Sequence, residues 1–350
     1  MKKERNSTID TLRFIAIFTV VAQHTNMFDY AYDSFGGEFF LFLKYAVVNI
    51  RFAIPFFFLA SGYFFGQSLR KGELLSKVVG RYSKRLFVLF ASWTVLYIFF
   101  PKYWMEHVIE FGFLRAIYWH VLDLGRILVM VFSKPVRLVM TGTEGHLWFL
   151  PALILSMLVL TALIARRKEK WILPVAVVLY SIGVGGEICN SLPSTGEFVF
   201  RTFWGPFIGT LFFSAGWWFS KQDDYSLKAA LWFLVGGVLL LMIENVFLWK
   251  FLHLKPEHAH LFGAVPLGIG IFLLALIYPN LGKGTIFPTL GNLTLGVYVL
   301  HILIRDGFLV FRPSFHPVVW DVFFPLVVYV VAAGLTLLMK RYKITNSLVN

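Results

Sequence analysis

The chain has 350 residues, of which 58% are hydrophobic and 18% aromatic, and its mean hydropathy is +0.72. This composition excludes an ordinary soluble domain and is typical of a polytopic membrane protein. The net charge is +13, but lysine and arginine gather beside the apolar runs, which indicates membrane topology, and we expect no nucleic-acid partner.

The apolar stretches predict an all-α polytopic membrane protein, a single domain over residues 1–350 with about ten transmembrane helices. We place these spans at about 12–28, 39–66, 85–101, 146–165, 171–187, 203–219, 228–249, 261–278, 291–311 and 319–340. Most lysines and arginines then lie on the side of the N-terminus, so the positive-inside rule places both termini in the cytoplasm. Residues 102–145 are too polar for a lipid-facing span and predict an extracytoplasmic or re-entrant cap.

The first span contains ionisable residues, which are costly inside a bilayer. Arg13 and His24 are eleven positions apart. Since a helix turns about 100° and rises about 1.5 Å per residue, they share one face, roughly 16 Å apart. Asp10 has the i,i+3 spacing that lets a carboxylate hold the Arg13 guanidinium. Two interpretations fit: a charged entrance leading to a buried imidazole, or an orientation charge at the membrane edge and a histidine that packs between helices.

The second span contains Arg51, followed four residues later by Pro55. Proline removes a backbone donor and predicts a kink within the membrane. The pair Ser61-Gly62 permits close approach of a neighbouring helix, so packing competes with a chemical role there. A mid-span Arg51 predicts an anion or a carboxylate as its partner inside the bundle. Glu244 of the seventh span is a candidate partner for a buried arginine, but the sequence does not indicate which arginine.

A short basic segment, with Arg81, Lys84 and Arg85, precedes the third span. Guanidinium groups bind phosphate bidentately, although the same charges also suit anionic lipids or orientation. Among the residues before the fourth span, His107 and Glu110 have i,i+3 spacing but lack convincing further ligands. We therefore expect no metal site.

Two further polar groups lie at the fourth and ninth spans. Glu144 and His146 directly precede Trp148 at the entrance of the fourth span, where tryptophan also serves as an interfacial anchor. Tyr298 and His301 have i,i+3 spacing and therefore share one face of the ninth span.

Four of these stretches together resemble the bacterial membrane acyltransferase family 3, whose members are O-acetyltransferase-like integral membrane proteins. The matching stretches are Asp10-x-Leu12-Arg13 with His24, the run from Arg51 through Pro55 to Tyr63, His146-Leu147-Trp148-Phe149-Leu150, and Leu295-Gly296-x-Tyr298-x-x-His301. The family often has Arg-x-x-Arg before the third helix. This sequence has Arg81-x-x-Lys84 and Arg81-x-x-x-Arg85 instead, which leaves open which pair is equivalent.

The resemblance implies a multi-pass enzyme of the bacterial cytoplasmic membrane. Such an enzyme would move an acyl group, expected to be acetyl, from cytoplasmic acyl-CoA to a hydroxyl of a cell-envelope carbohydrate or similar acceptor. We expect acyl-CoA as a co-substrate, no tightly bound cofactor, and membrane lipid as a further partner. The oligomeric state, the acyl chain length and the acceptor are left open.

The resemblance also assigns roles, with His24 as general base and Arg51 or Tyr298 stabilising the oxyanion. The donor-binding residues are expected to be Asp10, Arg13, Arg81 and Arg85, and the acceptor-binding residues Glu144, His146, Trp148 and His301. Direct transfer and a relay through an acylated histidine both fit the sequence. A transporter or flippase for a polar solute or lipid-linked glycan is the alternative, because it also needs buried polar residues and a broken span.

Overall fold

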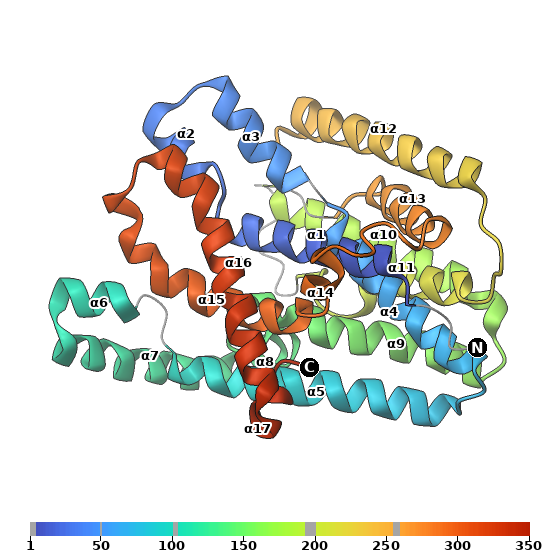
Figure 1. Ribbon diagram of the computed structural model, residues 1–350, viewed down its shortest axis with the longest axis horizontal. Coiled ribbons are helices and arrows are strands. Elements are labelled where there is room, and N and C mark those ends of the chain that lie inside the picture. The colour runs from blue at the N-terminus through green and yellow to red at the C-terminus, as the bar shows by residue number, and fades with distance from the viewer. Residues whose placement is uncertain (1–4, 50, 101–103, 193–200, 255–259) are drawn as a thin grey trace. The chain divides into compact units, whose positions relative to one another are not determined.

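The computed structural model describes residues 5–49, 51–100, 104–192, 201–254 and 260–350 (Figure 1). Every regular element in these residues is helical. They form two compact units, which are described separately. Unit 1 comprises Met1–Ala16, Asn49–Phe87 and Trp148–Asn292, and unit 2 comprises Ile17–Val48, Val88–Leu147 and Leu293–Asn350.

Seven helical segments are long and apolar enough to cross a membrane, counted over the described residues. They are Leu75–Phe111, in which residues 101–103 lie outside the described residues, Phe113–Ser133, Gly145–Ala165, Glu169–Ser191, Leu227–Leu252, Thr294–Ser314 and Pro317–Arg341. The protein is therefore a multi-pass helical membrane protein. The expected total of about ten spans and the cytoplasmic termini stay predictions.

The segment expected to form a cap is helical. It contains α6 (Trp104–Phe111), α7 (Phe113–Ser133) and α8 (Pro135–Thr141), while residues 102 and 103 lie outside the described residues. Unlike the sequence reading, which took this region as too polar, the structure shows α7 to have the length and hydropathy of a span. Its placement as an outer or re-entrant cap stays a prediction.

Unit 1 contains most of the helices between residues 53 and 291. They are α4 (Ala53–Arg70), α9 (Phe149–Ala165), α10 (Ile172–Ser191), α11 (Pro206–Phe219), α12 (Leu227–Leu252), α13 (Ala264–Ile277) and α14 (Phe287–Gly291). A Cβ at Gly62 of α4 would overlap the backbone carbonyl of Phe213 in α11, and one at Gly216 would overlap that of Leu59. The predicted close approach at Gly62 is therefore confirmed, with α11 as the neighbouring helix.

The break in the predicted second span lies before Pro55. Helix α3 (Glu38–Asn49) ends before this proline, and α4 starts at Ala53. Pro55 is therefore in the first turn of α4. The predicted kink at Pro55 within one long helix is wrong. The backbone N–H groups in the first turn of a helix have no intrahelical acceptor. Proline therefore costs no hydrogen bond there and favours the start of a helix.

Helix α1 (Ser7–His24) begins with a capped turn in unit 1. The Asn6 side chain accepts a hydrogen bond from the Ile9 amide at 2.9 Å, the usual arrangement of an N-terminal cap. The same side chain donates to the Ala275 carbonyl at 2.8 Å, and the Thr8 amide donates to the Pro279 carbonyl at 3.2 Å. These bonds fix the start of α1 against the end of α13.

Unit 2 contains the last turns of α1, the second half of α5 (Leu75–Phe99), and the C-terminal helices. Its other elements are α2 (Asp29–Phe35), α3, α6, α7, α8, α15 (Thr294–Phe308), η3 (Leu309–Ser314), α16 (Pro317–Arg341) and α17 (Lys343–Asn346). The Asp321 carboxylate of α16 accepts the Ala31 amide of α2 at 2.7 Å. Helix α15 packs on α16 and carries the polar residues described next.

Candidate active site

Three imidazoles, two of them buried, meet in unit 2, and we call His24, His146 and His301 the histidine cluster. His24 is the last residue of α1, His146 lies in the 3-10 turn η1 (Gly145–Trp148), and His301 is in the middle of α15. The ring centroids of His24 and His301 are 5.1 Å apart, those of His146 and His301 5.2 Å, and those of His24 and His146 6.4 Å. Residues from three distant parts of the chain thus form one group.

Backbone hydrogen bonds set the tautomer of His301. Its Nδ1 is 2.7 Å from the Tyr298 carbonyl oxygen and 3.2 Å from that of Val297. A carbonyl only accepts, so Nδ1 carries the proton and Nε2 has the lone pair. Within the described residues, His301 Nε2 and both ring nitrogens of His146 are buried without a hydrogen-bond partner. These nitrogens are therefore available to exchange a proton with a bound reactant.

Two tyrosines pack against His146. The Tyr97 ring is 5.4 Å from the His146 ring, and its hydroxyl donates to the Val299 carbonyl at 2.8 Å. The Tyr298 ring is 5.6 Å from His146, and its hydroxyl donates to the His146 carbonyl. This bond holds η1 in place. The expected role of Tyr298 at the oxyanion stays a prediction, and it requires the hydroxyl to give up this bond.

Arg305 brings a positive charge to the cluster. Its Nη1 donates to the His24 carbonyl at 3.1 Å, while Nε and Nη2 donate to Asp306 Oδ1 at 2.8 and 2.6 Å. The side chains of Arg305 and Asp306 are only 17% and 11% exposed. A guanidinium held at three points in a buried site is a fixed cation, which can stabilise developing negative charge.

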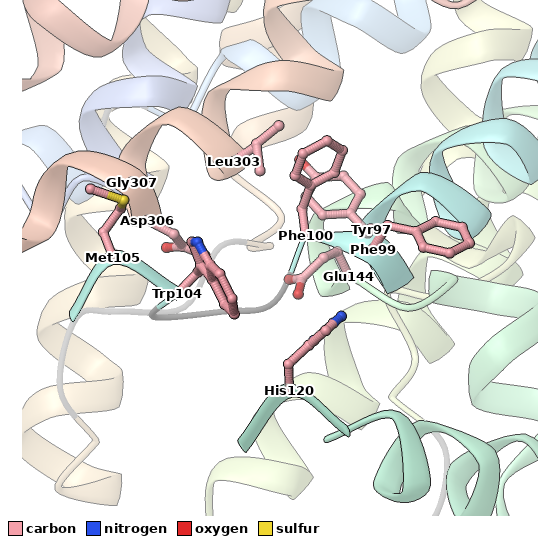
Figure 2. Close-up of a pocket in the computed structure, with 10 residues that line it drawn as sticks. All are labelled: Tyr97, Phe99, Phe100, Trp104, Met105, His120, Glu144, Leu303, Asp306 and Gly307. Atoms are coloured by element: carbon pink, nitrogen blue, oxygen red, sulfur yellow. The ribbon is translucent and has the colours of Figure 1, made fainter. Parts of the chain in front are cut away.

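A pocket of about 380 Å³ lies beside the cluster, within unit 2 (Figure 2). Its walls include Tyr97 and Asp306, so it adjoins both the His146 ring and the Arg305 ion pair. In Figure 2 the Glu144 carboxylate points into the space in front of Trp104. Glu144, one of the expected acceptor-binding residues, therefore lines a volume in the range of small-ligand sites.

A second polar site lies at the start of α1, among the residues that belong to unit 1. The predicted ion pair between Asp10 and Arg13 is present at 2.9 Å, and Arg5 Nε also donates to Asp10, at 2.5 Å. The Arg13 guanidinium lies 4.9 Å above the Phe64 ring. The Asp10 side chain is only 4% exposed, which makes this a partly buried network rather than a surface pair.

Three arginines of unit 1 lie within electrostatic range of Tyr82 in α5, and the Arg81 guanidinium lies 5.8 Å from its ring. Arg13, Arg81 and Arg85 all interact electrostatically with the Tyr82 hydroxyl. Arg81 donates to Glu73 at 2.6 and 3.4 Å, and this hydrogen bond holds the pKa of Glu73 below its usual value. The expected donor-binding arginines thus lie near one another, and Glu73 competes with an anionic ligand for one of them.

Two predicted site residues, Arg51 and Trp148, have partners within unit 1. Arg51 is 5% exposed and interacts electrostatically with Glu244, the partner class that the sequence predicted. Glu244 in turn accepts from the Phe262 and Gly263 amides at 2.9 and 2.7 Å, at the start of α13. The Trp148 ring packs 5.1 Å from Phe203 and 6.0 Å from His260. The catalytic role of Arg51 and the acceptor role of Trp148 stay predictions.

Among the described residues, no three histidine, cysteine or carboxylate side chains are arranged to hold a metal ion. Sequence reasoning placed His24, His146 and His301 in three separate stretches and did not assign roles to Tyr97, Arg305 or Asp306. The i,i+4 spacing between His301 and Arg305 was the available signal, because it places both on one face of α15.

Comparison with known proteins gives a family match over nearly the whole chain. The acyltransferase domain model of acyltransferase family 3 matches residues 6–339. A serine/alanine racemase of Enterococcus gallinarum is 31% identical over 311 residues, which cover 85% of this chain and 40% of the relative. An amino-acid racemase of Enterococcus faecalis is 27% identical over 318 residues, covering 86% and 41%. The chain thus spans about two-fifths of these relatives. No solved structure matches.

Proposed function

Because the chain belongs to the membrane proteins of acyltransferase family 3, we propose that it is an acyl-CoA-dependent O-acyltransferase. It moves an acyl group, expected to be acetyl, from cytoplasmic acyl-CoA to a hydroxyl of a cell-envelope carbohydrate or similar acceptor. The single observation that carries this proposal is the meeting of His24, His146 and His301 beside the Arg305 guanidinium. The proposal places the protein in a bacterial cytoplasmic membrane.

The donor is bound through its phosphates by the arginines of unit 1. Three guanidinium groups within electrostatic range of Tyr82 suit a ligand with several phosphate oxygens, since each can bind bidentately. Helix α1 carries Arg13 and ends at His24, roughly 16 Å further along its axis. A donor anchored at Arg13 and extended along α1 brings its thioester toward the imidazole.

The transfer step needs a base and a fixed positive charge. His24 takes the proton of the acceptor hydroxyl while the hydroxyl oxygen attacks the thioester carbonyl carbon. The carbon–oxygen bond forms, the carbon–sulfur bond breaks, and the proton on His24 passes to the leaving thiolate of CoA. Arg305, with its charge fixed by Asp306, stabilises the oxyanion between these events.

His146 and His301 also permit a second route, in which the acyl group is carried by a histidine. An imidazole nitrogen of His24 can instead attack the thioester and carry the acyl group to the acceptor. A second imidazole, with a lone pair on its Nε2 as in His301, then serves as base for the acceptor hydroxyl. Both routes consume the thioester and give the same ester.

Transport of a small amino acid is a second candidate function. The relatives are named as racemases that act on amino acids, and polar residues in a broken helical path also suit a solute pathway. Their racemase activity is not assigned to this chain, because it spans only about two-fifths of their length. A transporter would consume no thioester.

The first test measures donor binding and thiol release with purified protein in nanodiscs. We expect the native protein to bind acetyl-CoA and release CoA thiol with a panel of hydroxyl acceptors. Arg13→Ala is expected to weaken acetyl-CoA binding about 10- to 100-fold, the range for a lost hydrogen bond to a charged group. Arg70→Ala, which removes a different ion-paired arginine of unit 1, is the control. Absence of both binding and thiol release with every acyl-CoA tried would reject the transferase.

A further inference from the structure

Residues 347–349, which we call the C-terminal segment, pack against α5 within unit 2 (Figure 1). The Trp93 indole of α5, which is 3% exposed, donates a hydrogen bond to the Leu348 carbonyl at 2.7 Å. The next side chain, Val349, is only 1% exposed, although none of the residues of the preceding helix α17 is buried. The C-terminal segment is therefore docked on unit 2 by a buried side chain and a hydrogen bond from a buried indole.

Trp93 also contacts the tyrosine that packs on the histidine cluster. The ring centroids of Trp93 and Tyr97, one turn apart on α5, are separated by 5.6 Å. The Tyr97 ring is in turn 5.4 Å from the His146 ring, and its hydroxyl donates to the Val299 carbonyl at 2.8 Å. Aromatic rings in such contacts have preferred relative orientations, and a close-packed interior transmits a displacement from one ring to the next. The position of the indole therefore affects the imidazole through Tyr97.

The same part of α5 also holds the backbone that leads to His146. The Thr143 hydroxyl donates to the Thr94 carbonyl at 2.8 Å, and a Cβ at Gly142 would lie 2.5 Å from Thr94 Oγ1. His146 thus depends on α5 twice, through its approaching chain at Thr94 and through its ring at Tyr97. The C-terminal segment bonds to α5 within one turn of both positions.

We propose that Trp93 is a positioning residue for His146, held in place by the docked C-terminal segment and acting through Tyr97. This inference rests on the proposed acyl transfer, in which His146 contacts the acceptor. A buried indole N–H without an acceptor is costly, so release of the segment favours a different orientation of the indole. The Tyr97 ring then loses the support that keeps it against the His146 imidazole.

The first readout is the NMR signal of the His146 ring, measured on the full chain in nanodiscs with histidine isotope-labelled at Cε1. The signal is identified by its absence from His146→Gln. Trp93→Phe keeps an aromatic ring but removes the N–H that bonds the C-terminal segment. Val349→Asp leaves every ring in place and releases the segment, because burial of an unpaired charge is costly. We expect both variants to shift the His146 signal.

Matched controls accompany the two variants. Ser347→Asp adds the same charge at an exposed position of the C-terminal segment and should leave the His146 signal unchanged. Trp232→Phe makes the same ring change at a tryptophan of α12 that is 69% exposed, and it too should have no effect.

The second readout is the rate of thiol release from acetyl-CoA with the panel of hydroxyl acceptors. Trp93→Phe and Val349→Asp are each expected to lower kcat about 3- to 10-fold, the scale of one net hydrogen bond, while acetyl-CoA binding stays native. A general loss of structure would weaken both. The double variant should lower kcat no further than the stronger single variant, because both substitutions break the same link.

Three outcomes would overturn the inference: an unchanged His146 signal in Trp93→Phe or Val349→Asp, a native kcat in either variant, or multiplied effects in the double variant. If Val349→Asp does not fold, Trp93→Phe decides the first two. An unchanged signal with native thiol release intact rejects only the role of Trp93. A native protein that releases no thiol rejects the acyl transfer itself.

Discussion

At the scale of single residues, Arg305 connects the parts of the candidate site. Its guanidinium bonds the His24 carbonyl at the end of α1 and one oxygen of Asp306, which lines the pocket. The planar fork of arginine allows these bonds in different directions, whereas a lysine ammonium is a single point charge. The position of His24 and the orientation of Asp306 thus depend on the same group.

Arg305→Lys is expected to lower kcat for thiol release about 10- to 100-fold, because a small displacement of a catalytic group is costly. The KM for acetyl-CoA should change little, since Arg305 is not one of the proposed donor arginines. Steady-state kinetics of the variant check both statements. Arg126→Lys, which alters an exposed arginine paired with Asp123, is the control and should behave like the native protein. A rise in KM with unchanged kcat would show that Arg305 binds donor instead.

At the scale of elements, close packing of α4 on α11 depends on two glycines. The backbone of α11 approaches Gly62 so closely that a methyl group has no space, and the atom in its way is a backbone oxygen that cannot rotate aside. Small residues take this role in membrane helices because close backbone approach adds van der Waals contact. Gly62 is therefore explained by packing, and the neighbouring Phe56 and Phe58 are fully buried around it.

Gly62→Ala is expected to destabilise the protein by about 1–3 kcal/mol, the usual cost of an overpacked core. The destabilisation is measured by heating the protein in detergent and monitoring the loss of monodispersity as it unfolds. Gly236→Ala in α12 is the matched control, because a Cβ there meets no atom within 4 Å. The control should be neutral or slightly stabilising, since alanine favours a helix more than glycine does. Equal effects of the two substitutions would argue against the close α4–α11 contact.

The connection between α4 and α5 offers a test of the donor site. At neutral pH Glu73 is ionised and holds Arg81, so Glu73→Gln should release Arg81 and tighten acetyl-CoA binding by about two- to fivefold, the scale of a surface ion pair. The pKa of Glu73 is depressed, so the native pair is present above the usual carboxyl pKa and is lost as pH falls through the lower folded value.

The difference between Glu73→Gln and the native protein should therefore shrink as the pH of the binding assay is lowered into the acid range. Glu169→Gln, which breaks the exposed Lys221 pair of the same unit, serves as the control. An affinity unaffected by Glu73→Gln at neutral pH would remove Arg81 from the donor site.

At the scale of the whole molecule, much of the fold follows from hydropathy. The apolar runs that gave α9, α10, α12, α15 and α16 are long and uninterrupted, so their positions agree closely with the predicted spans. The kink predicted in the second span was wrong because the sequence alone does not distinguish a proline that kinks a helix from one in the first turn of a helix. Only the backbone before the proline distinguishes the two. In the region of α6 to α8, the length of α7 became apparent only with the helix boundaries, which the polar residues of the sequence do not show.

The types of residue in the candidate site could be predicted from the sequence, but their arrangement in space could not. The histidines could be identified from the sequence one at a time, since each lies within or at the end of a predicted span, where an ionisable side chain is costly. Their meeting depends on long-range packing, which spacing does not encode across more than 100 residues. Arg305 and Tyr97 were missed as functional residues for the same reason, because their partners His24 and His146 are distant in sequence.

The central claim, that the histidine cluster transfers an acyl group, is tested most directly by the rate of thiol release at saturating acetyl-CoA. The account predicts that His24→Ala lowers kcat at least about 100-fold while acetyl-CoA binding stays close to native, as for loss of a general base or nucleophile. His316→Ala, which removes an exposed histidine of the same unit, should retain native activity. A folded His24→Ala variant that keeps the native kcat would contradict the account.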